Sequence, residues 1–156
     1  KTKNEKINIQ TSLNESFNFL LSKDFPEWVE KDKSTFLSFL AGFTDAEGSI
    51  IKKNKISYYY SLGNYNSKLL FRIYKNLNNL GINCKEPKSD NRKGKVNIQG
   101  YKYNSDYWSL RIYNKDILLN LLNELKPYVK HRNKVKDLNR AILIIDNIRK
   151  SKIQEK

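Results

Sequence analysis

The sequence has very little cysteine, histidine or methionine, with one Cys, one His and no Met among its 156 residues. The lone Cys84 excludes a disulfide framework and a cysteine-based zinc site, so a small buried or strand residue is its simplest interpretation. No apolar run approaches the roughly 18 residues of a membrane span, and the amino end lacks the apolar stretch of a signal peptide. We therefore expect no membrane partner and an intracellular, unexported protein, located in the cytoplasm or in an organelle.

Acidic residues are also scarce, with 16 Asp and Glu against 30 Lys and Arg and a net charge of +14. This excess is larger than solubility needs and attracts phosphate. Nucleic acid is therefore favoured as the partner over an anionic membrane or a merely solvated basic surface. The chain is long enough for one sizeable core and short for two, which predicts a single globular domain.

Hydrophobic periodicity and turn residues predict an alternation of helices and strands. An amino-terminal accessory arm (1–33), with a short amphipathic helix around 12–21, precedes the main domain (34–150), and a tail (151–156) follows it. The expected elements of the domain are a helix over 34–47, strands over 49–53 and 56–64, a helix over 66–80, strands over 82–88 and 107–113, and helices over 115–125 and 133–149. The fold class is thus α+β, in the order αββαββα with one additional C-terminal helix.

The segment from Leu40 to Gly48 is chemically unusual. Asp45 and Glu47 lie in the last turn of an apolar helix, where the helix dipole disfavours acids by about 0.3–1 kcal/mol. The small residues of this segment would let a second copy of the helix approach closely, so that two Glu47 side chains converge. Converging carboxylates favour a hard cation such as Mg²⁺.

These nine residues resemble the signature of the LAGLIDADG homing endonucleases. They match it at Leu40, Ala41, Gly42, Asp45, Ala46 and Gly48, and Glu47 replaces the last acid conservatively. The resemblance covers about 35–149 and implies a homodimer, because chains with one motif pair through the motif helix. The residues expected at this interface are Leu40, Ala41, Gly42, Phe43 and Asp45.

The resemblance also implies a reaction. Glu47 and the carbonyl of Ala46 would bind Mg²⁺ or Mn²⁺, with Ca²⁺ as a non-catalytic substitute, whereas Asp45 is favoured as a structural hydrogen-bonding group. The expected activity is that of an intron-encoded, site-specific endonuclease. It would hydrolyse both strands of a long pseudo-palindromic DNA target and leave 3′ overhangs.

Two further catalytic positions follow from the resemblance, each with a departure from the family pattern. Arg132 stands where the family places a Lys after a Pro-aromatic pair, and it keeps the charge that stabilises a pentavalent phosphate but cannot readily exchange protons. Lys130 and Lys134 are alternatives for this role, and all three could instead contact only the DNA backbone. Asn64 stands where a Gln closes the second strand.

The family reads DNA with one face of its sheet in the major groove, where alternate residues of each strand are presented to bases. For the lysines, contact with phosphates is an equally good alternative. Arg92, Lys93, Lys95 and Lys102 of the long loop are expected to follow the DNA backbone. The expected DNA-binding residues are Ile51, Lys53, Lys55, Ser57, Tyr59, Ser61, Lys88, Ser109, Arg111, Lys130 and Lys134.

Two other functions fit the same sequence. Some family members are intron maturases that bind RNA and assist splicing, a role that a strongly basic chain also suits. A DNA-binding regulator that does not cleave is the second alternative, and the presence of Glu47 argues against it.

Overall fold

The computed structural model describes residues 26–154, with side chains described to Ser151. The predicted helix around 12–21 lies outside the described residues. The remainder confirms the α+β class, with strands and helices in the expected order. The elements are η2 (Glu27–Glu30), α1 (Lys33–Glu47), β1 (Gly48–Asn54), β2 (Ser57–Asn64), α2 (Ser67–Asn79), β3 (Lys88–Ser89), β4 (Trp108–Ile112), α3 (Lys115–Leu125) and α4 (Arg132–Gln154).

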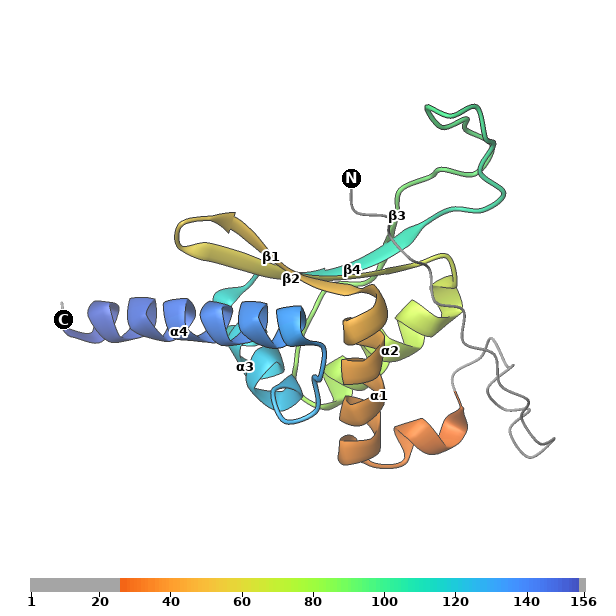
Figure 1. Cartoon of the computed structure of the whole chain (residues 1–156). Helices are drawn as coiled ribbons and strands as arrows, with labels where there is room; N and C mark the ends of the chain where they lie inside the picture. Colours follow the sequence, from red (N-terminus) through yellow and green to blue (C-terminus); the bar gives the residue numbers. More distant parts are fainter. Residues whose placement is uncertain (1–25, 155–156) are drawn as a thin grey trace, which may run out of the picture.

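The four strands form one antiparallel sheet in the order β1-β2-β4-β3. All four α-helices lie on one side of this sheet, and the other side is free of helices (Figure 1). The helix side holds the core, because Tyr60, Leu62 and Leu110 point from the strands into it and have no exposed surface. No described helix is long and apolar enough to cross a membrane.

The predicted third strand is much shorter than expected. Only Lys88 and Ser89 pair with β4, whereas the sequence predicted a strand over 82–88. Pro87 lacks a backbone N–H and cannot donate to a ladder, so pairing begins only after it. Ile82 instead completes the end of α2, because its backbone N–H donates to the carbonyl of Leu77 (2.9 Å).

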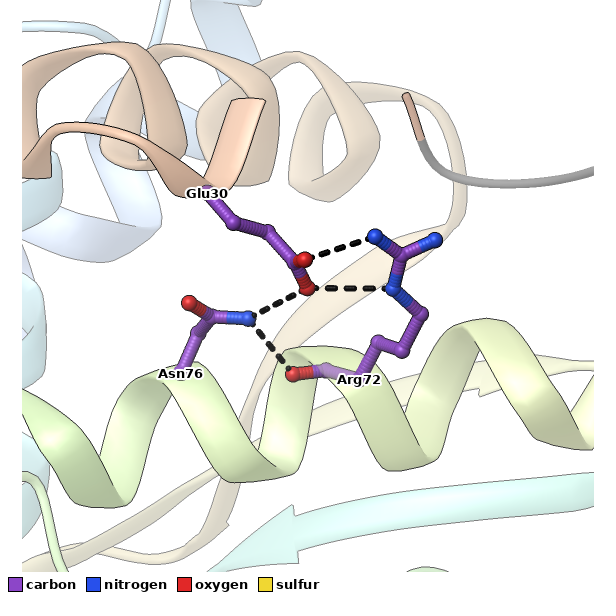
Figure 2. Close-up of polar contacts among 3 residues, drawn as sticks. All are labelled: Glu30, Arg72 and Asn76. Carbon is purple, nitrogen blue, oxygen red and sulfur yellow. Dashed lines mark hydrogen bonds and ion pairs between the residues drawn. The ribbon is translucent and has the colours of Figure 1, made fainter. Parts of the chain in front are cut away.

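Residues 26–32, which precede α1 in the sequence, pack against the main domain. Val29 is 1% exposed, and Glu30 accepts hydrogen bonds from Arg72 (2.6 and 3.0 Å) and Asn76 (2.8 Å) on α2 (Figure 2). The Arg72 guanidinium lowers the pKa of Glu30. Because both side chains are partly exposed, the ion pair adds no more than about 1 kcal/mol, and the burial of Val29 contributes more.

Helix α1 begins and ends on specific hydrogen bonds. The Asp32 side chain accepts from the backbone N–H of Thr35 (2.9 Å) and from the Ser34 hydroxyl (2.7 Å), which caps the first turn. Near the other end, the fully buried Thr44 hydroxyl donates to the carbonyl of Leu40 (2.7 Å) and contacts the hydroxyl of Tyr60 on β2 (2.7 Å). These bonds fix the carboxyl end of α1 against the sheet.

Candidate metal and DNA-binding site

The carboxyl end of α1 meets the amino end of α4. One carboxylate oxygen of Asp45 accepts hydrogen bonds from the backbone N–H groups of Lys130 (2.8 Å) and His131 (3.1 Å), just before α4 begins. A carboxylate is favoured there because the first N–H groups of a helix lack partners and carry partial positive charge. Asp45 therefore has the structural hydrogen-bonding role that the sequence favoured for it.

This junction brings a basic side chain beside the end of α1. The ammonium group of Lys134 donates to the carbonyl oxygen of Gly48, the residue that follows Glu47. Arg132 begins α4 as an exposed residue, and no contact of its guanidinium is found within the described part of the chain. Lys134 is thus the cation fixed next to Glu47, where the sequence favoured Arg132.

Glu47 and Ala46 are both exposed at the end of α1. Between residues 26 and 154 the Glu47 carboxylate has no hydrogen-bond or ion-pair partner, so its oxygens are available to a ligand. Carboxylate and carbonyl oxygens are the donors that Mg²⁺ prefers. One chain supplies too few of them, because no group of three His, Cys, Asp or Glu side chains gathers in the described residues. The residues fit a hard divalent cation only if a second copy adds its own Glu47.

The outer face of α1 differs from the interface that the sequence predicted. Leu40 and Ala41 are fully buried in the core of their own chain, so their assignment to a subunit interface is corrected. The exposed residues at four-residue spacing are small: Ser38, Gly42 and Ala46. A Cβ added at Gly42 would meet no atom within 4 Å. Beside this stripe, the half-buried rings of Phe39 and Phe43 stack with centroids 6.0 Å apart.

The helix-free face of the sheet contains the residues that the sequence assigned to it. Residues opposite each other in antiparallel strands point to the same face. Ser61 pairs with Arg111 and Ser49, Tyr59 pairs with Ile51, and Ser109 pairs with Lys88 and Gly63. The alternate residues are the buried ones, such as Tyr60 and Leu62. The three longer strands contain no acid, so the face is cationic.

Three members of the predicted set lie at the end of the β1–β2 hairpin. The pairing register shifts between Lys52 and Asn54, and Asn54 pairs with Ser57. Lys53 and Lys55 are exposed around this bulge, which twists the end of the hairpin away from the regular ladder. These two lysines add positive charge at the end of the hairpin, beyond the part of β2 that pairs with β4.

Sequence reasoning missed several residues of this face. Ser49 lies in the central row, and Tyr113 stacks on Tyr59 with ring centroids 5.1 Å apart. Tyr107 covers Gly63 so closely that an added Cβ would come within 2.1 Å of its hydroxyl oxygen. Alternation could have found all three, because each lies two residues from a predicted member of the same sequence-predicted strand, 49–53 or 107–113.

Asn64, predicted to have a catalytic role, makes a structural contact in this chain. Alternation along β2 places Asn64 on the helix side, in register with Trp108. Its side-chain oxygen accepts a hydrogen bond from the backbone N–H of Asn66 (2.8 Å), in the turn before α2.

A cavity of about 630 Å³ borders the cationic face, where the chain after Ile82 diverges from β4. Lys88, Ser109 and Arg111 form part of its wall together with Cys84. Burial raises the pKa of the Cys84 thiol to about 11. The thiol is therefore protonated at neutral pH and unsuited to nucleophilic attack.

Comparison with known proteins is consistent with this arrangement. Residues 35–126 match the family described as the LAGLIDADG-like domain. No curated protein matches the sequence. Two solved structures of the homing endonuclease I-CvuI are similar in fold. One, in complex with the I-CreI target in the presence of Mg, is 17% identical with a TM-score of 0.52 over 73% of this chain and 68% of that chain. The other, in complex with its own target in the presence of Ca, is 16% identical with a TM-score of 0.51 over 77% and 71% of the two chains.

Proposed function

This chain belongs to the LAGLIDADG-like family, and on that basis we propose that it is a site-specific, metal-dependent endonuclease that cuts double-stranded DNA as a homodimer. The observation that carries the proposal is the exposed carboxylate of Glu47, which has no partner within residues 26–154 and precedes the Gly48 carbonyl bound by Lys134, at the rim of a cationic sheet face. The structural relatives, which are homing endonucleases in complex with DNA targets, support the same conclusion.

Each part of the site has a role in this proposal. The cationic face of the sheet occupies the major groove, with Arg111 at its centre. Glu47 and the carbonyl of Ala46 would hold the divalent cation, together with Glu47 of a second copy. Mg²⁺ or Mn²⁺ bound there would supply polarisation of the scissile phosphate and activation of water, whereas Ca²⁺ would support binding alone. Lys134, with Arg132 nearby in sequence, stabilises the negative charge that builds up on the phosphate.

The homodimer is proposed to form through the outer face of α1. Ser38, Gly42 and Ala46 lack bulk, which permits close approach of a second helix backbone. Such packing would bring the two Glu47 residues together and complete the metal site. A pseudo-palindromic target follows, because a two-fold symmetric protein presents the same reading face to each half of the DNA. Cleavage of both strands would leave 3′ overhangs, and we propose an intron-encoded origin.

The activity can be tested on DNA targets that the protein itself selects. DNA duplexes selected for binding in Ca²⁺ from a random library are transferred to Mg²⁺ or to EDTA. The expected result is a double-strand break at one position, in Mg²⁺ only. Glu47→Gln should abolish cutting and preserve binding, whereas Glu27→Gln, which removes the same charge from η2, should leave both cutting and binding unchanged. Cutting by Glu47→Gln, or tight binding of structured RNA without any cleavage of DNA, contradicts the proposal.

Dimerisation has its own test. Gly42→Leu meets open space in the single chain and replaces a helical glycine, so the monomer should retain its stability or gain about 0.5–1 kcal/mol. The same side chain should block the close approach of two α1 helices. Sedimentation should then show a monomer that cannot cut DNA. Asn120→Leu places the same apolar side chain at an exposed position of α3 and should remain dimeric and active.

A further inference from the structure

The segment between β3 and β4 contains a built hairpin. Its two arms run from Gly94 to Asn97 and from Tyr101 to Tyr103, joined by backbone hydrogen bonds of 2.9 Å. Gly100 donates to the carbonyl of Asn97 (3.0 Å) and has a φ of 86°, a left-handed conformation that glycine adopts without strain. The Asn97 side chain accepts from the backbone N–H groups of Gln99 (3.0 Å) and Tyr101 (2.9 Å). The tip is therefore held in one conformation.

The base of the hairpin is fixed to the sheet by Arg92. Its guanidinium lies 5.0 Å from the ring centroid of Tyr107 and 5.7 Å from that of Tyr103, and it forms an ion pair with Asp90. The backbone N–H of Lys93 donates to Asp106 (2.8 Å). Arg92 is thus engaged within the protein.

The tip combines exposed apolar side chains with positive charge. Ile98 is fully exposed, and Tyr101 and Val96 are 71% and 63% exposed. Lys93, Lys95 and Lys102 flank them, and no acid occurs between residues 91 and 105. Exposure of apolar side chains to water is unfavourable, and a cluster of such residues with a charged rim is typical of a binding site.

The position of the hairpin indicates its partner. It rises from the end of the sheet on the side away from the helices, the same side as the cationic face (Figure 1). A partner covering that face would extend alongside the hairpin. The major groove, about 12 Å wide, admits a two-stranded ribbon. With about 3.3 Å for each residue between Asp90 and Ile98, the tip reaches at most about 26 Å, or about seven to eight base pairs.

We propose that this hairpin enters the major groove of the DNA beyond the sheet, with Lys93, Lys95 and Lys102 on phosphates and Ile98 against the methyl group of a thymine. The proposal rests on the DNA binding that is part of the proposed function. It adds a specificity-determining residue, Ile98, and extends each half of the target outward from the cut. A protein partner or an anionic membrane is disfavoured because the hairpin lies along the face that DNA would cover. If the hairpin bound either of these in place of DNA, the hairpin variants would leave DNA binding unchanged.

The first test concerns phosphate contacts, measured as the dependence of DNA affinity on salt in Ca²⁺. Replacing the three flanking lysines by Gln should reduce the slope of log affinity against log salt by about 2.7 per chain, at about 0.9 for each contact. The matched control replaces Lys31, Lys75 and Lys126 by Gln, which removes the same charge from exposed positions of the helix layer. The control should change the slope by less than one unit. Equal effects of the two triple variants overturn the proposal.

The second test concerns the tip. A variant with Asn-Gly in place of 95–102 should lose the outermost protected positions of a hydroxyl-radical footprint and keep the same cut position. Replacing one outer thymine by uracil should weaken binding of the natural chain about fourfold, the value of one buried methyl group, and should not affect Ile98→Ser. An unchanged footprint, or an equal uracil effect in both proteins, refutes the hairpin's role. These measurements need binding only, so absence of cleavage in Mg²⁺ would contradict the proposed function and leave this inference testable.

Discussion

The buried contact between Thr44 and Tyr60 leads to a prediction in which a second mutation repairs the first. Thr44 has one hydroxyl proton, which it donates to the carbonyl of Leu40, so Tyr60 must donate the hydrogen bond that joins the two hydroxyls. Thr44→Val therefore leaves a fully buried tyrosine hydroxyl without an acceptor, at a cost of about 1–3 kcal/mol. Tyr60→Phe leaves Thr44 bonded to Leu40 and should cost only about 0.5–1.5 kcal/mol.

The double variant tests this order of donors. Once Tyr60 is Phe, no hydroxyl is stranded, so the double variant should be more stable than Thr44→Val alone, with a non-additive term of about 1–2 kcal/mol. The measurement is urea unfolding at neutral pH, at one fixed protein concentration because association shifts apparent stability. Additive costs within about 0.5 kcal/mol would refute the reasoning.

A matched control lies two residues away on the same strand and face. The Tyr58 hydroxyl is buried and has no hydrogen-bond partner within residues 26–154. Tyr58→Phe should therefore be neutral or raise stability by up to about 1 kcal/mol, since no bond is lost and a stranded polar group is removed. A clear loss of stability in this variant would show that the hydroxyl has a partner.

Three further predictions follow from the site and the fold. Lys134→Met should lower the rate of cleavage by at least about tenfold and DNA affinity by much less, in single-turnover assays; equal losses of rate and affinity would assign Lys134 to binding alone. Gly63→Ala should destabilise the fold by about 1–3 kcal/mol because its Cβ displaces Tyr107, and adding Tyr107→Leu should recover part of the loss in thermal unfolding. Asp32 has a pKa lowered to about 2 by hydrogen bonds led by the Thr35 hydroxyl, so its stabilising contribution is complete above its ordinary pKa of 3.8 and is lost as pH falls toward 2. The difference in melting temperature between the natural chain and Asp32→Ala should accordingly be constant from about pH 5 to 7 and shrink in more acidic solution.

Local patterns in the sequence predicted most of the fold. The helix expected over 115–125 has those bounds, and the alternation along β1, β2 and β4 identified the helix-free face, because side chains of a strand alternate whatever the strand pairs with. The helix expected over 133–149 extends to Gln154, since no proline or glycine stops it. The short β3 could have been expected from Pro87.

Long-range contacts were not readable from periodicity. The docking of residues 26–32 includes the bond between Glu30 and Arg72, which lie 42 positions apart, and nothing local marks either residue. The contact of Lys134 with Gly48 was not readable for the same reason, because the α1–α4 junction decides which side chain reaches Gly48. The sequence placed Leu40 and Ala41 at the subunit interface, whereas the structure buries them in the core of their own chain. A helix that packs between a sheet and a proposed second subunit is apolar on both faces, so hydrophobicity alone does not tell on which face a residue lies.

The bonds from Asp45 to Lys130 and His131 have a consequence for how the protein is made. They join residues 85 and 86 positions apart, so the acidic and basic halves of the site meet only when the last helix of the domain has left the ribosome and docked. Until then the nascent chain carries Glu47 without its neighbouring cation. The order of synthesis thus delays assembly of the proposed cutting centre until the scaffold that positions it is complete.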